Sequence, residues 1–183
     1  GSIIVHNGTT NVRLAVGSDN DILMADSSDA EGIVWTPRAS LCEAFDSAGN
    51  TSITGTAATL PLGSSGIVDS IYSVASDQVT INDDGVFSIE FYVAYEITNT
   101  SGGVRGSAGG FVEVNTGGGF SEVSNSRSYT YHRETAGEMG TGKTVWITAS
   151  SGDIVRIRMQ RWTGTTNIDT IANQSYIRVQ KLR

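Results

Sequence analysis

The stretch VTINDDGVFSIEFYVAYEIT, residues 79–98, decides the fold of this chain. From residue 87 onward every second residue is apolar, and the residues between them are mostly polar or small. A period of two is typical of a β-strand that buries one side and exposes the other. The alternating apolar side chains are Phe87, Ile89, Phe91, Val93, Tyr95 and Ile97.

The sequence Asn82-Asp83-Asp84-Gly85, which precedes that strand, is typical of a turn. An Asp-Gly pair favours the tight turns that connect two antiparallel neighbours. We therefore predict a β-hairpin in which Val79 and Ile81 belong to the partner of the long strand.

Later segments repeat the alternation, at residues 111–115, 128–133, 144–149, 153–161 and 175–183. Within the second of them, Tyr129 and Tyr131 fall on one side, and Thr130 and His132 on the other. Glycine-, serine- and threonine-rich turns are expected at residues 100–103, 115–119, 137–142, 150–152 and 163–167. Many short strands, frequent turns and no helical periodicity predict an all-β antiparallel sandwich or barrel.

The composition agrees with short strands joined by tight turns. Of the 183 residues, 22 are Gly and 38% are hydrophobic, below the average of roughly 45–50%. The net charge of −7 argues against nucleic-acid and anionic-membrane partners, which need a basic face. No apolar run approaches the roughly 18 residues of a membrane-spanning helix, so we expect no membrane insertion. The single cysteine, Cys42, is expected to be a small buried thiol.

The first 45 residues differ from the rest, and we assign residues 1–45 and 46–183 to separate domains. Residues 3–5 and 12–16 flank a polar turn, which predicts a hairpin. An acidic, turn-rich stretch with few apolar residues follows, so we expect this segment to pack against other copies or the main domain. Gly1-Ser2 stands where an initiator Met would. We expect a cleavage scar or an excision point from a longer protein, with no visible secretory signal.

A resemblance to bacteriophage proteins lies in this first segment. The matching motifs are Gly8-Thr9-Thr10-x-Val12-x-Leu14-x-Val16-Gly17-x-Asp19, Leu23-x-Ala25-Asp26 and Gly32-x-Val34-Trp35. The pattern resembles a module of tail-fibre and other virion appendage proteins. There it forms a hairpin-rich neck or shaft between an attachment region and a head.

Residues 50–183 resemble the trimeric jelly-roll heads of the TNF and complement globular-head type. The matching motifs are Val79-Thr80-Ile81-x-x-x-Gly85-Val86-Phe87-x-Ile89, Gly152-Asp153-x-Val155-x-Ile157 and Ser175-x-Ile177-x-Val179. Together the two resemblances imply a homotrimeric virion protein with an outward head, used for host recognition or capsid decoration. Its N-terminal region would contact other virion proteins. A collagen-like Gly-X-Y stalk is not encoded in this chain.

Aromatic residues opposite the strongest apolar pattern are candidates for the trimer interface. These are Tyr92, Trp146 and Tyr176, although ordinary surface aromatics would give the same pattern. Arg178 joins them, because Arg156, Arg158 and Arg178 are expected to form a basic strand face. That face would pair with Glu90 or Glu96 of another copy.

Exposed aromatics flanked by Arg, Asn and Thr can stack on sugar rings and bond their hydroxyl groups. The first candidate cluster is Trp162 with Arg161 and Asn167, and the second is Tyr131 with His132 and Arg133. The loop at residues 115–120 is a third candidate, since binding in β scaffolds often uses loops. The alternative is that Trp162 caps the edge of the sandwich.

Residues 137–144, GEMGTGKT, match the phosphate-binding pattern G-x-x-x-x-G-K-[ST]. Such a loop follows a buried strand and opens a helix. Here residues 131–135 are polar and residues 145–148 favour a strand. We therefore predict a flexible turn between two strands and no nucleotide site.

No other pattern singles out catalysis or metal binding. His6 and His132 have no Cys or second His at ligand spacing, and His132 is expected to face solvent or another copy. No G-x-S-x-G motif is present, and no carboxylate pair stands out for glycoside cleavage. The N-terminal aspartates lack the pattern of a calcium loop. They are Asp19, Asp21, Asp26 and Asp29.

Two functions from different classes follow. The first is a non-enzymatic virion protein, without cofactor or metal, whose trimeric head attaches to a host-surface glycan or protein or decorates a capsid. The alternative is a secreted or cell-surface module of TNF fold that binds carbohydrate or acts like a cytokine.

Overall fold

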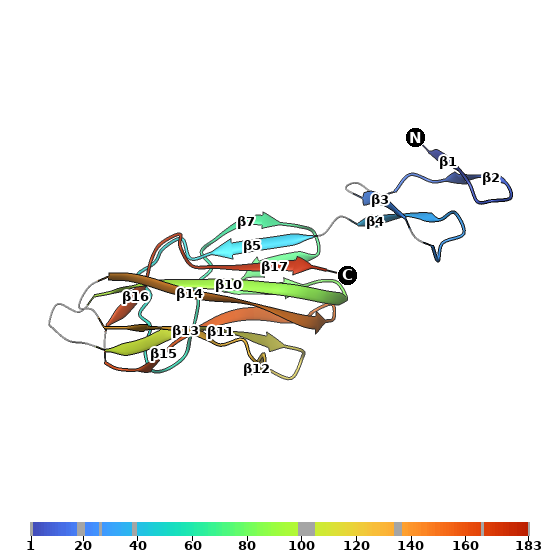
Figure 1. Cartoon of the computed structure of the whole chain (residues 1–183). Coiled ribbons are helices and arrows are strands. Elements are labelled where there is room, and N and C mark those ends of the chain that lie inside the picture. Colours follow the sequence, from blue (N-terminus) through green and yellow to red (C-terminus); the bar gives the residue numbers. More distant parts are fainter. Residues whose placement is uncertain are drawn as a thin grey trace. The chain divides into compact units, whose positions relative to one another are not determined.

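The computed structural model describes residues 2–17, 21–25, 27–37, 40–98, 105–133, 137–165 and 167–182. These residues form strands, turns and loops, and the chain separates into two units, Gly1–Ser40 and Leu41–Arg183 (Figure 1). Within the described ranges, no helix has the length and apolar character that crossing a bilayer requires. The expectation of an all-β chain is confirmed.

The first unit consists of two separate two-stranded sheets. Strand β1 (Ile3–His6) pairs with β2 (Asn11–Leu14), and β3 (Asp21–Ala25) pairs with β4 (Ile33–Pro37). The hairpin expected around residues 6–11 is therefore confirmed. No side chain described in this unit is fully buried, so its hairpins do not enclose a core of their own.

The second unit is a sandwich of two antiparallel sheets (Figure 1). The first sheet has the order β14-β10-β17-β5-β7, with β16 also paired to β10. Its strands are β5 (Leu41–Phe45), β7 (Ser64–Val68), β10 (Gly85–Ile97), β14 (Gly137–Ala149), β16 (Ile168–Thr170) and β17 (Tyr176–Lys181).

The second sheet has the order β12-β11-β15-β9-β8, with β13 paired to β11 and β6 to β15. Its strands are β6 (Ala58–Thr59), β8 (Tyr72–Ala75), β9 (Gln78–Ile81), β11 (Gly106–Asn115), β12 (Phe120–Glu122), β13 (Ser128–His132) and β15 (Ile154–Thr163). The two sheets together form the expected jelly-roll sandwich.

The core lies between the two sheets. The six alternating apolar residues of β10 are all buried, as their period of two predicted. From the second sheet, Val155, Ile157 and Met159 of β15 bury the same side of their strand. Each sheet therefore offers one apolar face to the core and keeps a polar or aromatic face outside.

The predicted hairpin at residues 79–98 is wrong. Strand β9 pairs with β8 and β15 in the second sheet, whereas β10 belongs to the first. Residues 82–84 therefore carry the chain from one sheet to the other, so that Ile81 and Phe87 both reach the shared core. Polar contacts fix the crossing: Lys181 Nζ lies 2.6 Å from Asp83 Oδ2, and the Ser151 amide donates to Asp84 Oδ1.

The turn predicted at residues 137–142 is also wrong, because β14 runs without interruption and pairs with β10 along its whole length. Its glycines make room for packing. A Cβ at Gly140 would lie 2.2 Å from Tyr92 Oη, and one at Gly142 would lie 2.3 Å from the Phe91 carbonyl oxygen. The turns at 115–119 and 150–152 are present, and the one expected at 100–103 lies outside the described residues.

The two units divide between Ser40 and Leu41, five residues before the boundary that we placed at 45/46. Residues 41–45 form β5, which pairs with β17 and β7 in the first sheet. Burial of Cys42 on this strand, with 0% exposure, confirms the expected buried thiol. Burial also raises its pKa to about 12, with a smaller contribution from Asp69, so the thiol stays protonated.

Candidate functional site

The outer face of the first sheet gathers the residues predicted for the trimer interface. In register across the sheet, Ser88 of β10 pairs with Trp146 of β14, and Tyr92 pairs with Tyr176 of β17. Trp146 is 75% exposed, which is unusual for so large an apolar ring. The sequence-predicted aromatics therefore lie on one side of one sheet.

A polar cluster occupies the middle of this face. Arg178 of β17 donates to Glu43 Oε2 of β5, with Nη2 at 2.5 Å and Nε at 3.0 Å, and its Nη1 lies 3.3 Å from Glu90 Oε2. The Tyr176 hydroxyl donates to Glu90 Oε1 at 2.6 Å. The rings of Tyr92 and Tyr176 stack with centroids 6.2 Å apart. Every charge in the cluster thus has a partner within the same chain.

The chemistry of this cluster is structural. Burial first, and the hydrogen bond to Glu90 second, raise the pKa of Tyr176 to about 12. The hydroxyl therefore remains a proton donor at neutral pH and cannot serve as a base. The hollows on this face are shallow, and two of them are lined by Tyr176 together with its neighbours on β10, β14 and β5.

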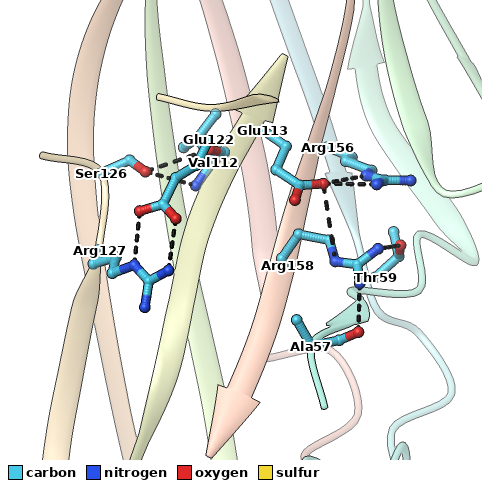
Figure 2. A network of polar contacts seen from close by, with 9 residues as sticks. All are labelled: Ala57, Thr59, Val112, Glu113, Glu122, Ser126, Arg127, Arg156 and Arg158. Atoms are coloured by element: carbon cyan, nitrogen blue, oxygen red, sulfur yellow. Dashed lines mark hydrogen bonds and ion pairs between the residues drawn. The ribbon is translucent and has the colours of Figure 1, made fainter. Parts of the chain in front are cut away.

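The expected basic strand face is corrected by the structure. Arg178 lies in the first sheet, whereas Arg156 and Arg158 belong to β15 in the second. Glu113 of β11 forms ion pairs with both of these arginines (Figure 2). Its Oε2 lies 2.7 Å from Arg156 Nη2 and 3.9 Å from Arg158 Nε. Glu90 pairs with Arg178 of its own chain. Each of the three arginines therefore has a carboxylate partner on a neighbouring strand of the same chain.

A second cluster lies on the outer face of the second sheet, around β13. The Tyr129 and Trp162 rings are 5.8 Å apart, and the Arg127 guanidinium lies 5.6 Å from the centre of the Trp162 ring and 4.9 Å from that of Phe111. The Arg127 guanidinium donates two hydrogen bonds to the Glu122 carboxylate (Figure 2). Nε lies 2.7 Å from Oε1, and Nη2 lies 2.7 Å from Oε2. Trp162 is therefore one of several stacked groups rather than an isolated edge cap.

Of the other predicted binding residues, Tyr131 is 48% exposed and Arg133 stacks on it at 5.6 Å. Arg161 of β15 stands opposite Ala108 of β11, close to Trp162 in the chain. Asn167 adjoins β16, which pairs with β10 in the first sheet. The structure thus brings Tyr131 and Arg133 together and places Asn167 just before β16, beside Thr98 at the end of β10.

The expectation that His132 faces solvent is wrong, because only 1% of it is exposed. Its ring lies edge-on to that of Tyr95 at 6.3 Å. Burial, and to a smaller extent the charge of Arg161, lower the pKa of His132, so it is neutral at pH 7. Strand alternation explains the correction, since His132 and the exposed Tyr131 must point to opposite sides of β13.

Sequence reasoning did not single out Arg127, Tyr129, Glu122 or Phe111 as binding residues. Tyr129 could have been found, because it shares the outward side of β13 with Tyr131. The Arg127–Glu122 pair had no such signal, since it depends on a turn in which the Ser126 hydroxyl accepts from the Val112 amide at 3.0 Å (Figure 2).

No group of three or more His, Cys, Asp or Glu side chains able to hold a metal ion is found among the described residues. Asp19 and Asp26 lie outside these residues. The Asp29 carboxylate accepts a hydrogen bond from the Glu31 amide at 2.9 Å, which is ordinary turn geometry. The GEMGTGKT segment is a paired strand, so it lacks the loop that would wrap a phosphate.

Comparison with solved structures identifies the architecture. The Eiger TNF of S. frugiperda matches with a TM-score of 0.59 and 10% identity, over 79% of this chain and 93% of that one. Murine APRIL at pH 8.0 matches with a TM-score of 0.53 and 11% identity, over 79% of this chain and all of that one. The chain has a TNF-like jelly-roll fold. No protein-family model and no curated protein matches its sequence.

Proposed function

We propose that this chain is a non-enzymatic protein that assembles as a homotrimer through the outer face of its first sheet. The TNF-like head would be displayed outward on a virion, as a fibre or decoration head that attaches to a host surface. The observation that carries the proposal is Trp146, which is 75% exposed on the same sheet face as the stacked rings of Tyr92 and Tyr176.

Burial of this face against other copies is favourable on two counts. Removing a large aromatic surface from water supplies the hydrophobic driving force. Glu43 and Glu90 both pair with Arg178, and Glu90 also accepts from the Tyr176 hydroxyl, so each ion keeps a partner on burial although the cluster carries one net negative charge. A face with free charges would resist the same contact.

The N-terminal unit supports assembly independently. Large apolar side chains are exposed on its isolated hairpins, and a lone two-stranded hairpin is marginally stable in water. They are Ile3, Ile4, Val16, Ile22, Leu23 and Met24. A trimeric head would hold three copies of this unit at high effective concentration, because only a few residues separate β4 from β5. We assign this unit to the neck, in contact with other virion proteins.

A second candidate is a secreted or cell-surface TNF-fold module. The similarity to the Eiger TNF and APRIL structures favours it, whereas the resemblance of residues 8–35 to virion appendages favours the first candidate. Both candidates use the same trimer. Neighbouring genes for virion structural proteins would favour the virion head, and a signal peptide on the full-length protein would favour the secreted module.

The trimer is tested by light scattering over a range of protein concentrations. We expect a mass three times that of the 19.3 kDa chain, and a lower mass for Trp146→Glu with an unchanged circular dichroism spectrum. Tyr129→Glu, a matched change on the second sheet, should leave the mass unchanged. A monomeric wild-type chain would overturn the proposal.

A further inference from the structure

Four exposed residues and the half-buried Trp162 form a surface on and around β13, here named the arginine–tyrosine patch. They are Arg127, Tyr129, Tyr131, Arg133 and Trp162. Tyr129 is 65% exposed and Tyr131 is 48% exposed, and both stand on the outward side of one strand. Two tyrosines held in water on neighbouring outward positions form a platform that the core does not require.

The patch is held in place from the side and from behind. Glu122 fixes Arg127 with two hydrogen bonds of 2.7 Å, and Arg127 in turn stacks on Trp162. Behind the platform, the Thr130 hydroxyl donates to the Gly140 carbonyl of β14 at 2.9 Å. Because these contacts already hold the side chains in place, little conformational entropy is lost when a ligand binds.

The patch is positively charged in a chain whose net charge is −7. Arg133 stacks on Tyr131, and Arg105 directly precedes Gly106, which pairs with His132, the neighbour of Arg133. In the described part of the chain, the ion pairs of this sheet involve Arg127, Arg156 and Arg158, and no carboxylate pairs with Arg105 or Arg133. Among the described residues, the guanidinium groups of Arg105 and Arg133 at this end of the sheet thus have no carboxylate partner and can take an anion.

We infer that the arginine–tyrosine patch binds an acidic saccharide, with sugar rings on Tyr129 and Tyr131 and a carboxylate on Arg133. The ring faces of sugars carry C–H groups that pack on aromatic rings, and the planar fork of arginine matches a carboxylate with two hydrogen bonds. An open strand face also suits an extended chain of sugars better than a small molecule, which needs an enclosing pocket. The overall negative charge of the protein disfavours a nucleic acid, whose charge is far denser.

This inference rests on the proposed role in surface attachment and names its ligand class, but it does not depend on the trimer. Three patches on one trimer would strengthen binding to a polymer through a high effective concentration. A single chain would still bind a short oligosaccharide. Measuring short probes and protein mass on the same samples therefore separates failure of this inference from failure of the trimer.

The experiment is calorimetric titration of the full chain with oligosaccharides of polygalacturonate, alginate and hyaluronan. Methyl esters of the same oligosaccharides are the matched ligand controls, because they keep the rings and lose the charge. We expect binding of at least one free acid and none of its ester. Loss of the charge-assisted bonds in Arg133→Gln should weaken binding roughly tenfold, and Tyr131→Ala should weaken it severalfold.

Arg13→Gln, which removes an exposed arginine from the N-terminal unit, is the charge-matched control and should bind as the wild type does. The inference is overturned if none of the three acids binds, if the esters bind equally well, or if Arg133→Gln has no effect. Equal affinity for a single-stranded oligonucleotide would also overturn it, since that result would indicate a general polyanion surface.

Discussion

Arg178 reaches across the β17–β5 pair to Glu43, with Nη2 2.5 Å from Oε2, in the middle of the outer face of the first sheet. Both side chains keep about a third of their surface in water within one chain, at 39% and 32%. Such a partly exposed pair contributes little to stability because water screens it. The strength of this pair therefore depends on whether the face is covered.

This dependence gives the first prediction, a double-mutant cycle of Arg178→Met and Glu43→Gln. In a monomer the coupling energy should be about 1 kcal/mol or less. In a trimer that buries the face, Arg178→Met leaves the carboxylates of Glu43 and Glu90 without their cation, and the loss of unfolding free energy should rise to about 3 kcal/mol. Glu43→Gln should lose less, because Arg178 keeps Glu90 as a partner. Urea unfolding at two protein concentrations measures both cases. A coupling energy that does not change with oligomeric state would place the pair outside the interface.

Gly140→Ala is predicted to destabilise the fold, although it adds only one methyl group and Gly140 does not have a positive φ. The new Cβ would lie 2.2 Å from Tyr92 Oη, which is far inside contact distance. Displacing that ring should cost about 1–3 kcal/mol and lower the melting temperature. Gly118→Ala is the matched control, since nothing lies within 4 Å of its Cβ. Equal melting temperatures of the two variants would contradict the packing role of Gly140.

Strand β10 was predictable from sequence because its alternation reports burial directly. Its partner was not, because the Asp83-Asp84-Gly85 turn has the same local chemistry whether the chain stays in one sheet or crosses to another. The residues on either side of the turn, Ile81 and Phe87, belong to different sheets, and the turn contacts Lys181, which lies almost a hundred residues away in the chain. Turn residues therefore predict where a strand ends but not which sheet follows.

The N-terminal half of β14 was missed for a related reason. Glycine usually marks turns, and the glycines of GEMGTGKT gave that signal. Here Gly140 is needed by the Tyr92 ring on the neighbouring strand, which no local pattern reveals. In the candidate site, Tyr131 and His132 were grouped because they are adjacent in the sequence. Successive side chains of a strand point to opposite faces, so Tyr131 is exposed and His132 is buried. The outward pairing of Tyr131 with Tyr129 was available from the period of two alone.

Asp46→Ala is predicted to be among the more damaging single changes in the second unit. Its buried carboxylate accepts hydrogen bonds from the amides of Ala48 and Gly49 and, at 2.6 Å, from the Thr170 hydroxyl. Leaving these donors unsatisfied should cost about 1–3 kcal/mol of unfolding free energy. Asp46→Asn keeps an acceptor and should lose less. The exposed Asp84→Ala should lose less than Asp46→Ala, and a reversed order in urea unfolding would refute the assignment.

The last prediction concerns alkaline pH. Burial raises the pKa of Cys42 from 9.0 to about 12 and that of Tyr95 from 10.0 to about 12. Above about pH 9 the unfolded chain therefore releases protons that the folded chain retains, so the unfolding free energy must fall as the pH rises toward 12. Urea midpoints between about pH 8 and pH 11 measure this loss. In Cys42→Ala the decline should begin later, near the ordinary pKa of tyrosine, because only the tyrosines with a raised pKa, Tyr72, Tyr95 and Tyr176, then contribute. The native thiol should also resist a thiol reagent at about pH 8 until denaturant is added. Rapid modification of the native protein, or a midpoint that does not depend on pH, would show that Cys42 is not held in a dry core.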